Sequence, residues 1–133
     1  MRLPLLIIPL IIFLDQVTKA EFATSCNSGV AFSLFSNVGI LTVFVPIFIV
    51  GSCLIFLLRS KSKLVFWALS IIVGGGLSNI VDRLTVGCVR DFIDLKFWPS
   101  FNLADSAVVF GVSMLIYSVL TKVEVKNSND SNH

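Results

Sequence analysis

The sequence predicts an all-α membrane protein with four transmembrane helices, and two observations support this fold class. Of the 133 residues, 56% are hydrophobic and 14% are charged, whereas soluble domains are about 25% charged. The apolar residues gather in four segments, at about residues 3–22, 38–58, 64–81 and 103–120, and a spanning helix needs about 20 residues. A chain this short forms one domain, which we place at residues 1–121, followed by a polar cytoplasmic tail at 122–133.

The first apolar segment differs from the others because charged residues enter its second half. Residues 3–14 carry no charge, whereas Asp15, Lys19 and Glu21 fall in the turns that follow, together with Gln16. This segment spans a membrane only if its outer turns hold these polar groups. The same charges argue against a cleaved signal peptide, whose apolar core is closely followed by small residues.

Lysine and arginine residues in short loops set the orientation of a membrane protein. The side that holds the basic hairpin Arg59–Lys63 is predicted to be cytoplasmic, and both chain termini fall on that side. Its cations are Arg2, Arg59, Lys61, Lys63, Lys122 and Lys126. Six of the eight acidic residues fall at or beyond the outer face: Asp15, Glu21, Asp82, Asp91, Asp94 and Asp105. The outer face is therefore where we expect a functional site.

Composition also excludes several function classes. The formal charge of +2 is small, and no basic run is interleaved with aromatic residues, so nucleic acid is not an expected partner. The one histidine, His133, ends the polar tail, and the three cysteines form no CxxC motif, so neither a metal site nor a cofactor is expected. Cys26 and Cys88 both fall on the outer side, and a disulfide between them is left open.

Polar residues near the outer interface recur at helical spacing. Asn79, Asp82 and Arg83 are spaced i, i+3, i+4 at the end of the third segment, and so share a helix face. Asn102 and Asp105 share a face in the same way at the start of the fourth segment. Two further pairs lie near the same interface: Asp15 with Lys19, and Asp91 with Asp94. Because charged groups at membrane depth are costly and usually functional, these groups are expected to converge.

Convergent carboxyl groups favour acid–base chemistry. Two carboxyls about 3 Å apart cannot both ionise, so they share one proton. The ionised carboxylate can then take a proton from water, while the protonated one polarises a carbonyl oxygen. This is peptide hydrolysis without a nucleophilic side chain or a metal. Neighbouring asparagine amides could hold a substrate backbone, because an amide both donates and accepts hydrogen bonds.

Each of these groups also has a structural interpretation. Asp82 beside Arg83 is more typical of an interfacial ion pair than of a catalyst, and Asp15 with Lys19 is typical of a pair at a helix end. Other groups fit structural roles as well: cross-helix hydrogen bonds for Asn79 and Asn102, close helix packing for Gly74–Gly76, and a solvated loop charge for Asp94. Composition and spacing alone do not choose which two aspartates form the catalytic pair.

Five short blocks of the sequence resemble the lipoprotein signal peptidases, or signal peptidase II family. The blocks are DQVTK (Asp15–Lys19), NSGVAFS (Asn27–Ser33), GGGLSNIVDR (Gly74–Arg83), VRDF (Val89–Phe92) and FNLADS (Phe101–Ser106). Each block is short, but together they occur in the order and at the membrane positions of that family, and they span the chain from Asp15 to Ser106.

The resemblance implies a membrane aspartic endopeptidase of the bacterial cytoplasmic (inner) membrane. Such an enzyme removes the signal peptide from lipid-modified prolipoproteins, cutting before the diacylglyceryl-modified cysteine, with its active site at the outer face. It implies Asp91 and Asp105 as the catalytic dyad. The implied substrate-binding or site-supporting residues are Asn27, Asn79, Arg83, Asn102, Asp15 and Lys19. The family needs no cofactor or metal and is inhibited by the cyclic peptide globomycin.

The chain departs from the family pattern at two places. Ser78 stands where the block GGxxGN usually has glycine, and close packing should survive because serine is small. Seven residues, Ala20–Cys26, separate Lys19 from Asn27, where the family usually has a longer stretch that contributes to an extracytoplasmic β-cradle. We therefore expect a small, shortened β element, in which residues of the stretch Asn27–Phe32 form a strand pair, with weaker grip on substrate and inhibitor.

Three alternatives remain open at the level of sequence. A serine–lysine peptidase would use Lys19 or Lys96 with one of the serines, but no spacing places a serine beside a lysine base. The serines in question are Ser28, Ser33, Ser78 and Ser106. A small ion or proton carrier would need acids across the whole membrane, and the inner halves of the segments hold none. The short β element also allows a catalytically weak or inactive relative that binds lipoproteins.

Overall fold

The computed structural model describes residues 3–29 and 39–130, with residues 123–130 described as backbone alone. A short 3-10 helix, η1 (Leu3–Leu6), leads directly into α1. One short strand follows α1, and another follows α3. The elements follow in the order α1 (Ile7–Phe22), β1 (Ser25–Asn27), α2 (Leu41–Arg59), α3 (Lys63–Thr85), β2 (Val89–Asp91) and α4 (Leu103–Asp130).

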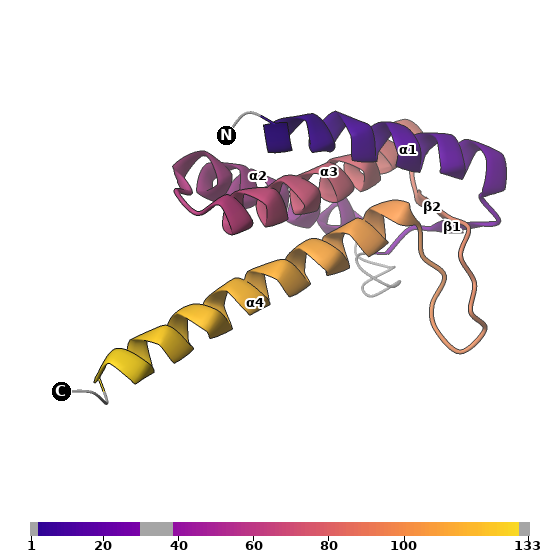
Figure 1. The fold of residues 1–133 in the computed structure, drawn as a ribbon. Helices are drawn as coiled ribbons and strands as arrows, with labels where there is room; N and C mark the ends of the chain where they lie inside the picture. Colours follow the sequence, from indigo (N-terminus) through magenta and orange to yellow (C-terminus); the bar gives the residue numbers. More distant parts are fainter. Residues whose placement is uncertain (1–2, 30–38, 131–133) are drawn as a thin grey trace.

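Within residues 3–29 and 39–130, four helical segments are long and apolar enough to cross a membrane, which confirms the predicted fold class. Their bounds are Leu3–Phe22, Leu41–Arg59, Lys63–Thr85 and Leu103–Lys122. Figure 1 shows that the start of α1 and the end of α4 lie at one end of the bundle, whereas β1 and β2 lie at the other. The bundle therefore has a polar strand end and a terminal end.

The observed helix boundaries differ from the predicted ones at two ends. Helix α3 runs to Thr85 rather than 81, so Asp82 and Arg83 belong to its last turns. Helix α4 runs to Asp130 rather than 120, and it therefore includes most of the polar tail. Residues 121–130 contain neither Gly nor Pro, so nothing in the chain breaks the helix where hydropathy falls. The predicted start of the second segment, residue 38, lies outside the described residues.

Helix α3 is the centre of the bundle. Of its most apolar 18-residue window, 67% is buried, compared with 17% in each of the other three helices, and α3 contacts α1, α2 and α4. Its glycines face a different helix each: Gly74 faces Ile8 and Ile11, Gly75 faces Ala104, and Gly76 faces Val50. The prediction of close packing along Gly74–Gly76 is confirmed, and this packing brings the start of α4 against α3.

Gly75→Ala is expected to destabilise the bundle. A Cβ at Gly75 would lie 2.5 Å from the backbone oxygen of Ala104, and backbone cannot yield as a flexible side chain can. We expect a loss of about 1–3 kcal/mol, measured as a lower Tm in lipid nanodiscs. Gly51→Ala is the matched control, because nothing lies within 4 Å of a Cβ at Gly51. Equal Tm values for the two variants would contradict this account.

The β element is a two-stranded antiparallel pair that joins the ends of α1 and α3. Ser25 lies opposite Asp91, Cys26 opposite Arg90 and Asn27 opposite Val89. The expected small strand pair is present, but its first strand ends at Asn27 instead of beginning there. Residues 30–32 of the expected stretch Asn27–Phe32 lie outside the described residues. A bridge between Ile93 and Phe101 closes the loop that follows β2. The pairing brings Asp91 back over the start of α4.

Candidate active site

Asp105 lies in the first turn of α4, where it forms a reciprocal cap with Asn102. The backbone N–H of Asp105 donates to Asn102 Oδ1 at 2.9 Å, and the backbone N–H of Asn102 donates to Asp105 Oδ2 at 3.2 Å. This arrangement satisfies free N–H groups at a helix start. It also fixes the direction of the Asp105 carboxylate through Asn102, the last residue before α4.

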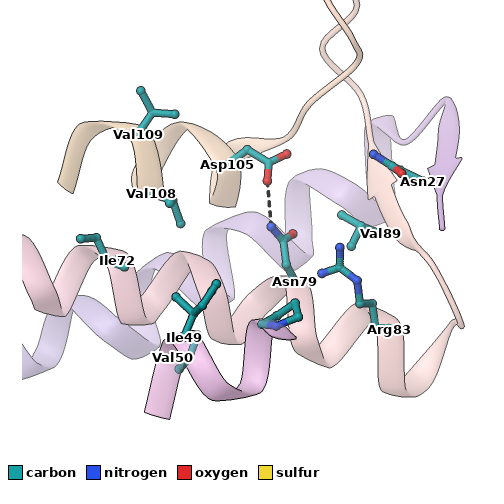
Figure 2. A pocket seen from close by; sticks show the side chains of 12 residues that line it. Asn27, Ile49, Val50, Ile72, Asn79, Arg83, Val89, Asp105, Val108 and Val109 are labelled. Carbon is teal, nitrogen blue, oxygen red and sulfur yellow. Dashed lines mark hydrogen bonds between the residues drawn. The ribbon is translucent and has the colours of Figure 1, made fainter. Parts of the chain in front are cut away.

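Asn79 and Asn102 connect the two helices that carry the site. Asn79 Nδ2 donates to Asp105 Oδ1 at 2.9 Å, as drawn in Figure 2, and Asn102 Nδ2 donates to Asn79 Oδ1 at 3.2 Å. The expected cross-helix hydrogen bond is thus present. It coexists with a second role, because each asparagine also binds a carboxylate. Both oxygens of Asp105 therefore accept a hydrogen bond from an asparagine.

Asp91 ends β2, and Asn102 holds it on the same side as Asp105. Asn102 Nδ2 donates to Asp91 Oδ1 at 2.8 Å, so one asparagine contacts both carboxylates. Asp91 is 1% exposed. Its other oxygen, Oδ2, is buried and has no hydrogen-bond partner among the described residues. A buried carboxylate oxygen without a partner is costly to keep in a native structure, and it identifies the atom that is free for chemistry.

Burial, together with the nearby charge of Asp105, raises the pKa of Asp91 to about 6. The hydrogen bond from Asn102, the charge of Lys19 and the side chain of Asn27 oppose this shift. Asp91 lies outside the four spanning segments, at the polar end of the bundle. A proton shared between two carboxyls near neutral pH is what acid–base hydrolysis requires.

The raised pKa makes the stability of the protein depend on Asp91. The folded chain keeps the Asp91 proton up to about pH 6, while the unfolded chain releases it near 3.8. The contribution of Asp91 to stability is thus complete below about pH 4 and lost as the pH rises through 6. We expect Asp91→Asn to exceed wild type by about 1–3 kcal/mol at pH 8, with no difference at pH 4, in thermal unfolding followed by tryptophan fluorescence.

Asp94→Asn is the control for that measurement. Asp94 lies in the exposed loop, so burial does not raise its pKa as it does that of Asp91. Hydrogen bonds from Lys96 lower the pKa of Asp94 instead. Its replacement should leave the pH dependence of Tm unchanged. A gain from Asp91→Asn that is the same at pH 4 and pH 8 would show that ionisation of Asp91 is not its cause.

Asp82 is structural, but its partner is not the one expected from the sequence. Its carboxylate pairs with Arg90 at 2.8 Å and with Lys19 at 3.3 Å, and it accepts the backbone N–H of Arg90 at 2.9 Å. The predicted ion pair with Arg83 was wrong. The reason is that Arg90 reaches Asp82 from β2, whereas Arg83 Nη2 donates to the backbone oxygen of Gly29 at 2.7 Å.

Asp15 and Lys19 form the predicted pair, and both side chains are fully buried. Lys19 Nζ lies 2.6 Å from Asp15 Oδ2 and donates to Asn79 Oδ1 at 2.9 Å. The other oxygen of Asp15 accepts the backbone N–H of Ala104 at 2.8 Å. The pair is therefore more than a helix-end contact: Asp15 holds the first turn of α4, and Lys19 orients the amide that binds Asp105.

Three residues belong to this network although the sequence assigned them no hydrogen-bonding role: Ser78, Gln16 and Arg90. Ser78 donates to Asp15 Oδ2 at 2.6 Å, so the residue that replaces a common glycine binds the network. Gln16 Nε2 donates to Asp82 at 2.9 Å, and Gln16 Oε1 accepts from Arg90 at 2.7 Å. The only sequence signal for Gln16 was that it directly follows Asp15. Nothing in the sequence placed Arg90 beside α3, because that contact depends on strand pairing.

A cavity of about 190 Å³ opens beside Asp105 between α2, α3 and α4. Figure 2 shows apolar side chains along one part of it and polar groups at the strand end. The apolar residues include Ile49, Val50, Ile72, Val108 and Val109, and the polar ones are Asn27, Asn79, Arg83 and Asp105. Arg83 interacts electrostatically with Asp91 and Asp105. The cavity thus connects an apolar groove to the carboxylate of Asp105.

The residues expected from the sequence therefore meet at one place, with one exception. Asp94 lies apart, in an ion pair with Lys96 whose side chain is 86% exposed, as expected for a solvated charge. The others gather around the start of α4: Asp15, Lys19, Asn27, Asn79, Arg83, Asp91, Asn102 and Asp105. No group of three or more His, Cys, Asp or Glu residues with the arrangement of a metal site occurs within residues 3–29 and 39–130.

Comparisons with known proteins agree with this arrangement. A family model described as signal peptidase (SPase) II matches residues 20–121. The lipoprotein signal peptidase of Pelotomaculum thermopropionicum is 32% identical over an alignment of 136 positions, which covers 86% of this chain and 90% of that protein. The lipoprotein signal peptidase of Moorella thermoacetica is 43% identical over 99 residues, covering 71% of this chain and 64% of that protein.

A solved structure of a bacterial membrane enzyme has the same fold. It superposes with a TM-score of 0.83 at 27% identity, over 95% of this chain and 92% of that chain. The match includes nearly the whole of both chains. The chain belongs to the signal peptidase II family, the lipoprotein signal peptidases.

Proposed function

We propose that this chain is an aspartic endopeptidase that removes signal peptides from diacylglyceryl-modified prolipoproteins, with Asp91 and Asp105 as its catalytic dyad. Membership of the signal peptidase II family supports the substrate class. The aspartic mechanism rests on one observation: Asn102 hydrogen-bonds Asp91 and Asp105 at once, while Asp91 Oδ2 is buried without a partner among the described residues. The two carboxyls can therefore act on one bond.

The dyad would hydrolyse the peptide bond through a shared proton. Asp91, with a pKa of about 6, holds that proton and donates it from Oδ2 to the scissile carbonyl oxygen. Asp105, held by Asn79 and Asn102, accepts a proton from the attacking water. When the tetrahedral intermediate collapses, Asp105 gives that proton to the leaving amine of the lipid-modified cysteine, and Asp91 takes back a proton from the hydroxyl of the intermediate. The C–N bond breaks, the signal peptide leaves with a new C-terminal carboxyl group, and the dyad returns to its starting state. The apparent pKa values of such a reaction belong to the pair.

The cavity supplies the positioning that acid–base chemistry needs. Its apolar wall suits the hydrophobic part of a signal peptide, which enters from the lipid between α2 and α4. Arg83 Nε is buried and has no hydrogen-bond partner in the part of the chain that the structure describes, so it is available for a substrate carbonyl. Asn27 also lines the cavity, at the strand end where Arg83 lies (Figure 2). The two side chains could hold the residues that flank the scissile bond.

Two features support an outer location for the site, with both termini in the cytoplasm. Cations at the terminal end, such as Arg59, Lys61 and Lys122, line one shallow pocket and have no ion-pair partner among the described residues, as expected of a cytoplasmic face. At the strand end, Cys26 and Cys88 form a disulfide, which is typical of an oxidising compartment outside the cytoplasm. The hydrolysed bond would thus lie at the outer face of the cytoplasmic membrane.

A serine–lysine mechanism is not supported by the contacts of the lysines. Lys19 is held by Asp15, Asp82 and Asn79, and Lys96 by Asp94. No hydrogen bond joins either lysine to a serine among the described residues. A base must lie within hydrogen-bond reach of its nucleophile, so the dyad is the better candidate.

The function is tested with the purified chain in lipid nanodiscs and two forms of one prolipoprotein, with and without the diacylglyceryl group. We expect the signal peptide to be released from the lipidated form alone, as a shift in gel mobility, in the presence of a metal chelator, and to be blocked by globomycin. Equal cleavage of both forms would contradict the substrate class. A folded protein that binds the lipidated precursor without cutting it would instead be a binding-only relative.

A further inference from the structure

A disulfide joins the two strands beside the candidate dyad. It links Cys26, the middle residue of β1, to Cys88, the residue that precedes β2, with their Cα atoms 5.6 Å apart. This separation is usual for a disulfide. Cys26 is exposed, so a reductant in the surrounding water can reach the bond. Cys88 is 8% exposed and is packed against the end of α3.

The strand pair is too small to be held by pairing alone. Each strand has three residues, and an isolated two-stranded pair is marginally stable at best. Ser25 and Cys26 are exposed and Asn27 is half-buried, so β1 contributes little packing. The disulfide, which joins the middle of β1 to the residue before β2, therefore adds a covalent hold to this pair.

The position of Asp91 depends on this pair, whereas that of Asp105 does not. Asp105 is capped by Asn102, the residue just before α4, and is held from α3 by Asn79. The backbone oxygen of Asp91 accepts the N–H of Thr24 at 2.9 Å, and Asp91 lies opposite Ser25 in the register, while Asn102 holds its side chain. The chain around β1 thus positions the backbone of Asp91 over the start of α4. A movement of β1 acts directly on Asp91, whereas Asp105 keeps its hydrogen bond from Asn79 on α3.

Arg90 attaches β2 to α3 independently of the disulfide, so the disulfide matters mainly for β1. Arg90 pairs with Asp82 at 2.8 Å, which holds β2 to α3 even without the disulfide. Strand β1 has no comparable ion pair among the described residues. Opening the disulfide should therefore release β1 with Asn27, loosen Asp91, and leave the helices intact. The expected consequence is a loss of catalytic efficiency rather than of the fold.

We propose that Cys26 and Cys88 are positioning residues, whose disulfide holds β1 and Asp91 in place and makes cleavage depend on an oxidising compartment. This inference rests on the proposed dyad. Opening the bond requires a dithiol reductant: the reductant gives up two electrons and two protons and becomes a disulfide, and each cysteine gains one hydrogen as a thiol. The reverse exchange with a disulfide oxidant restores the bond.

The test compares wild type with the double variant Cys26→Ser/Cys88→Ser in lipid nanodiscs, before and after dithiothreitol. Cys53→Ser is the matched control, because Cys53 is a free cysteine within α2. The substrate cysteine carries its lipid as a thioether, so dithiothreitol does not alter it. We expect reduction to lower kcat of wild type and Cys53→Ser by about 10- to 100-fold, with a smaller change in KM and recovery on reoxidation. The double variant should be low in both states.

A second readout separates positioning from general destabilisation. If Asp91 loses burial, the pKa that limits cleavage on the alkaline side should move to lower pH on reduction, while Tm of the helices changes little. Amide hydrogen exchange should rise in peptides that cover residues 24–27 and 88–91 and stay slow in α3. Reduced wild type that keeps its kcat and pH profile would overturn the inference, as would unchanged exchange at 24–27.

The same experiment separates this inference from the proposed function. If oxidised wild type cleaves nothing, the proposed function fails, and the exchange measurement alone decides whether the disulfide positions Asp91. If oxidised wild type cleaves and reduced wild type cleaves equally well, the function stands and the inference fails. If the double variant still responds to dithiothreitol, the response arises elsewhere and the inference fails.

Discussion

Asp91→Asn and Asp105→Asn should each lower kcat for signal-peptide cleavage by about 10²–10⁴-fold, the usual contribution of general acid–base catalysis. An asparagine at either position keeps the size of the side chain and can still hydrogen-bond Asn102, but it can neither accept nor release the shared proton. Cleavage of a lipidated prolipoprotein in nanodiscs, followed by gel shift at several substrate concentrations, gives kcat and KM separately. We expect KM to change less than kcat.

Two comparisons make this result specific to the dyad. Asp94→Asn removes an aspartate from the same loop without touching the site, since Asp94 pairs with Lys96 in solvent, and it should cleave as wild type does. The double variant Asp91→Asn/Asp105→Asn should be no slower than either single variant, because residues that act as a unit are not additive. Substantial cleavage by Asp105→Asn would show that another carboxylate carries the chemistry.

The four spanning helices follow from the sequence because hydropathy decides them. A stretch of about 20 apolar residues has few alternatives to a helix in a membrane. The helix ends are less readable. Helix α3 continues through Asp82 and Arg83 because ion pairs and hydrogen bonds from other elements satisfy these residues. Hydropathy counts them as charges that end the span, and so the predicted boundary fell at residue 81.

The site was predictable where it depends on one helix and not where it depends on strand pairing. Helical spacing correctly placed Asn79 with Asp82 and Asn102 with Asp105, because i, i+3 neighbours share a face. The partner of Asp82 is Arg90, a residue of β2, and its approach depends on the register between β1 and β2. Local spacing contains no information on that register. The disulfide likewise depends on it, and the sequence left that pairing open.

The polar groups form one network that crosses the bundle from α1 to α4. Lys19 contacts Asp15 on its own helix, and both Asp82 and Asn79 on α3. Asp15 in turn binds the first turn of α4 through the N–H of Ala104. Burying charges costs free energy, and a buried ion pair is weak evidence of stability by itself. What the network supplies is position: it fixes the start of α4, and with it Asp105, against α3.

Because Lys19 joins three acceptors, Lys19→Met should be among the most damaging single changes in the chain. Methionine fills similar volume but leaves the carboxylate of Asp15 with no ion-pair partner within 4 Å among the described residues, and removing one partner of a buried pair costs about 3–5 kcal/mol. We expect a fall in Tm of several degrees or more in nanodiscs. Lys96→Met, which breaks an ion pair in solvent, should leave Tm unchanged.

Cleavage by Lys19→Met distinguishes positioning from mere stability. At a temperature where the variant is still folded, loss of the bond from Lys19 to Asn79 Oδ1 frees the amide that orients Asp105, so kcat should fall as well. The variant Lys19→Arg, which keeps the charge, should recover Tm more than kcat, because a guanidinium cannot reproduce the compact geometry of the ammonium group. A Lys19→Met protein with the Tm and kcat of wild type would mean that Lys19 does not hold the start of α4, and that the hydrogen bonds of Asp15 and Asn79 to α4 are sufficient.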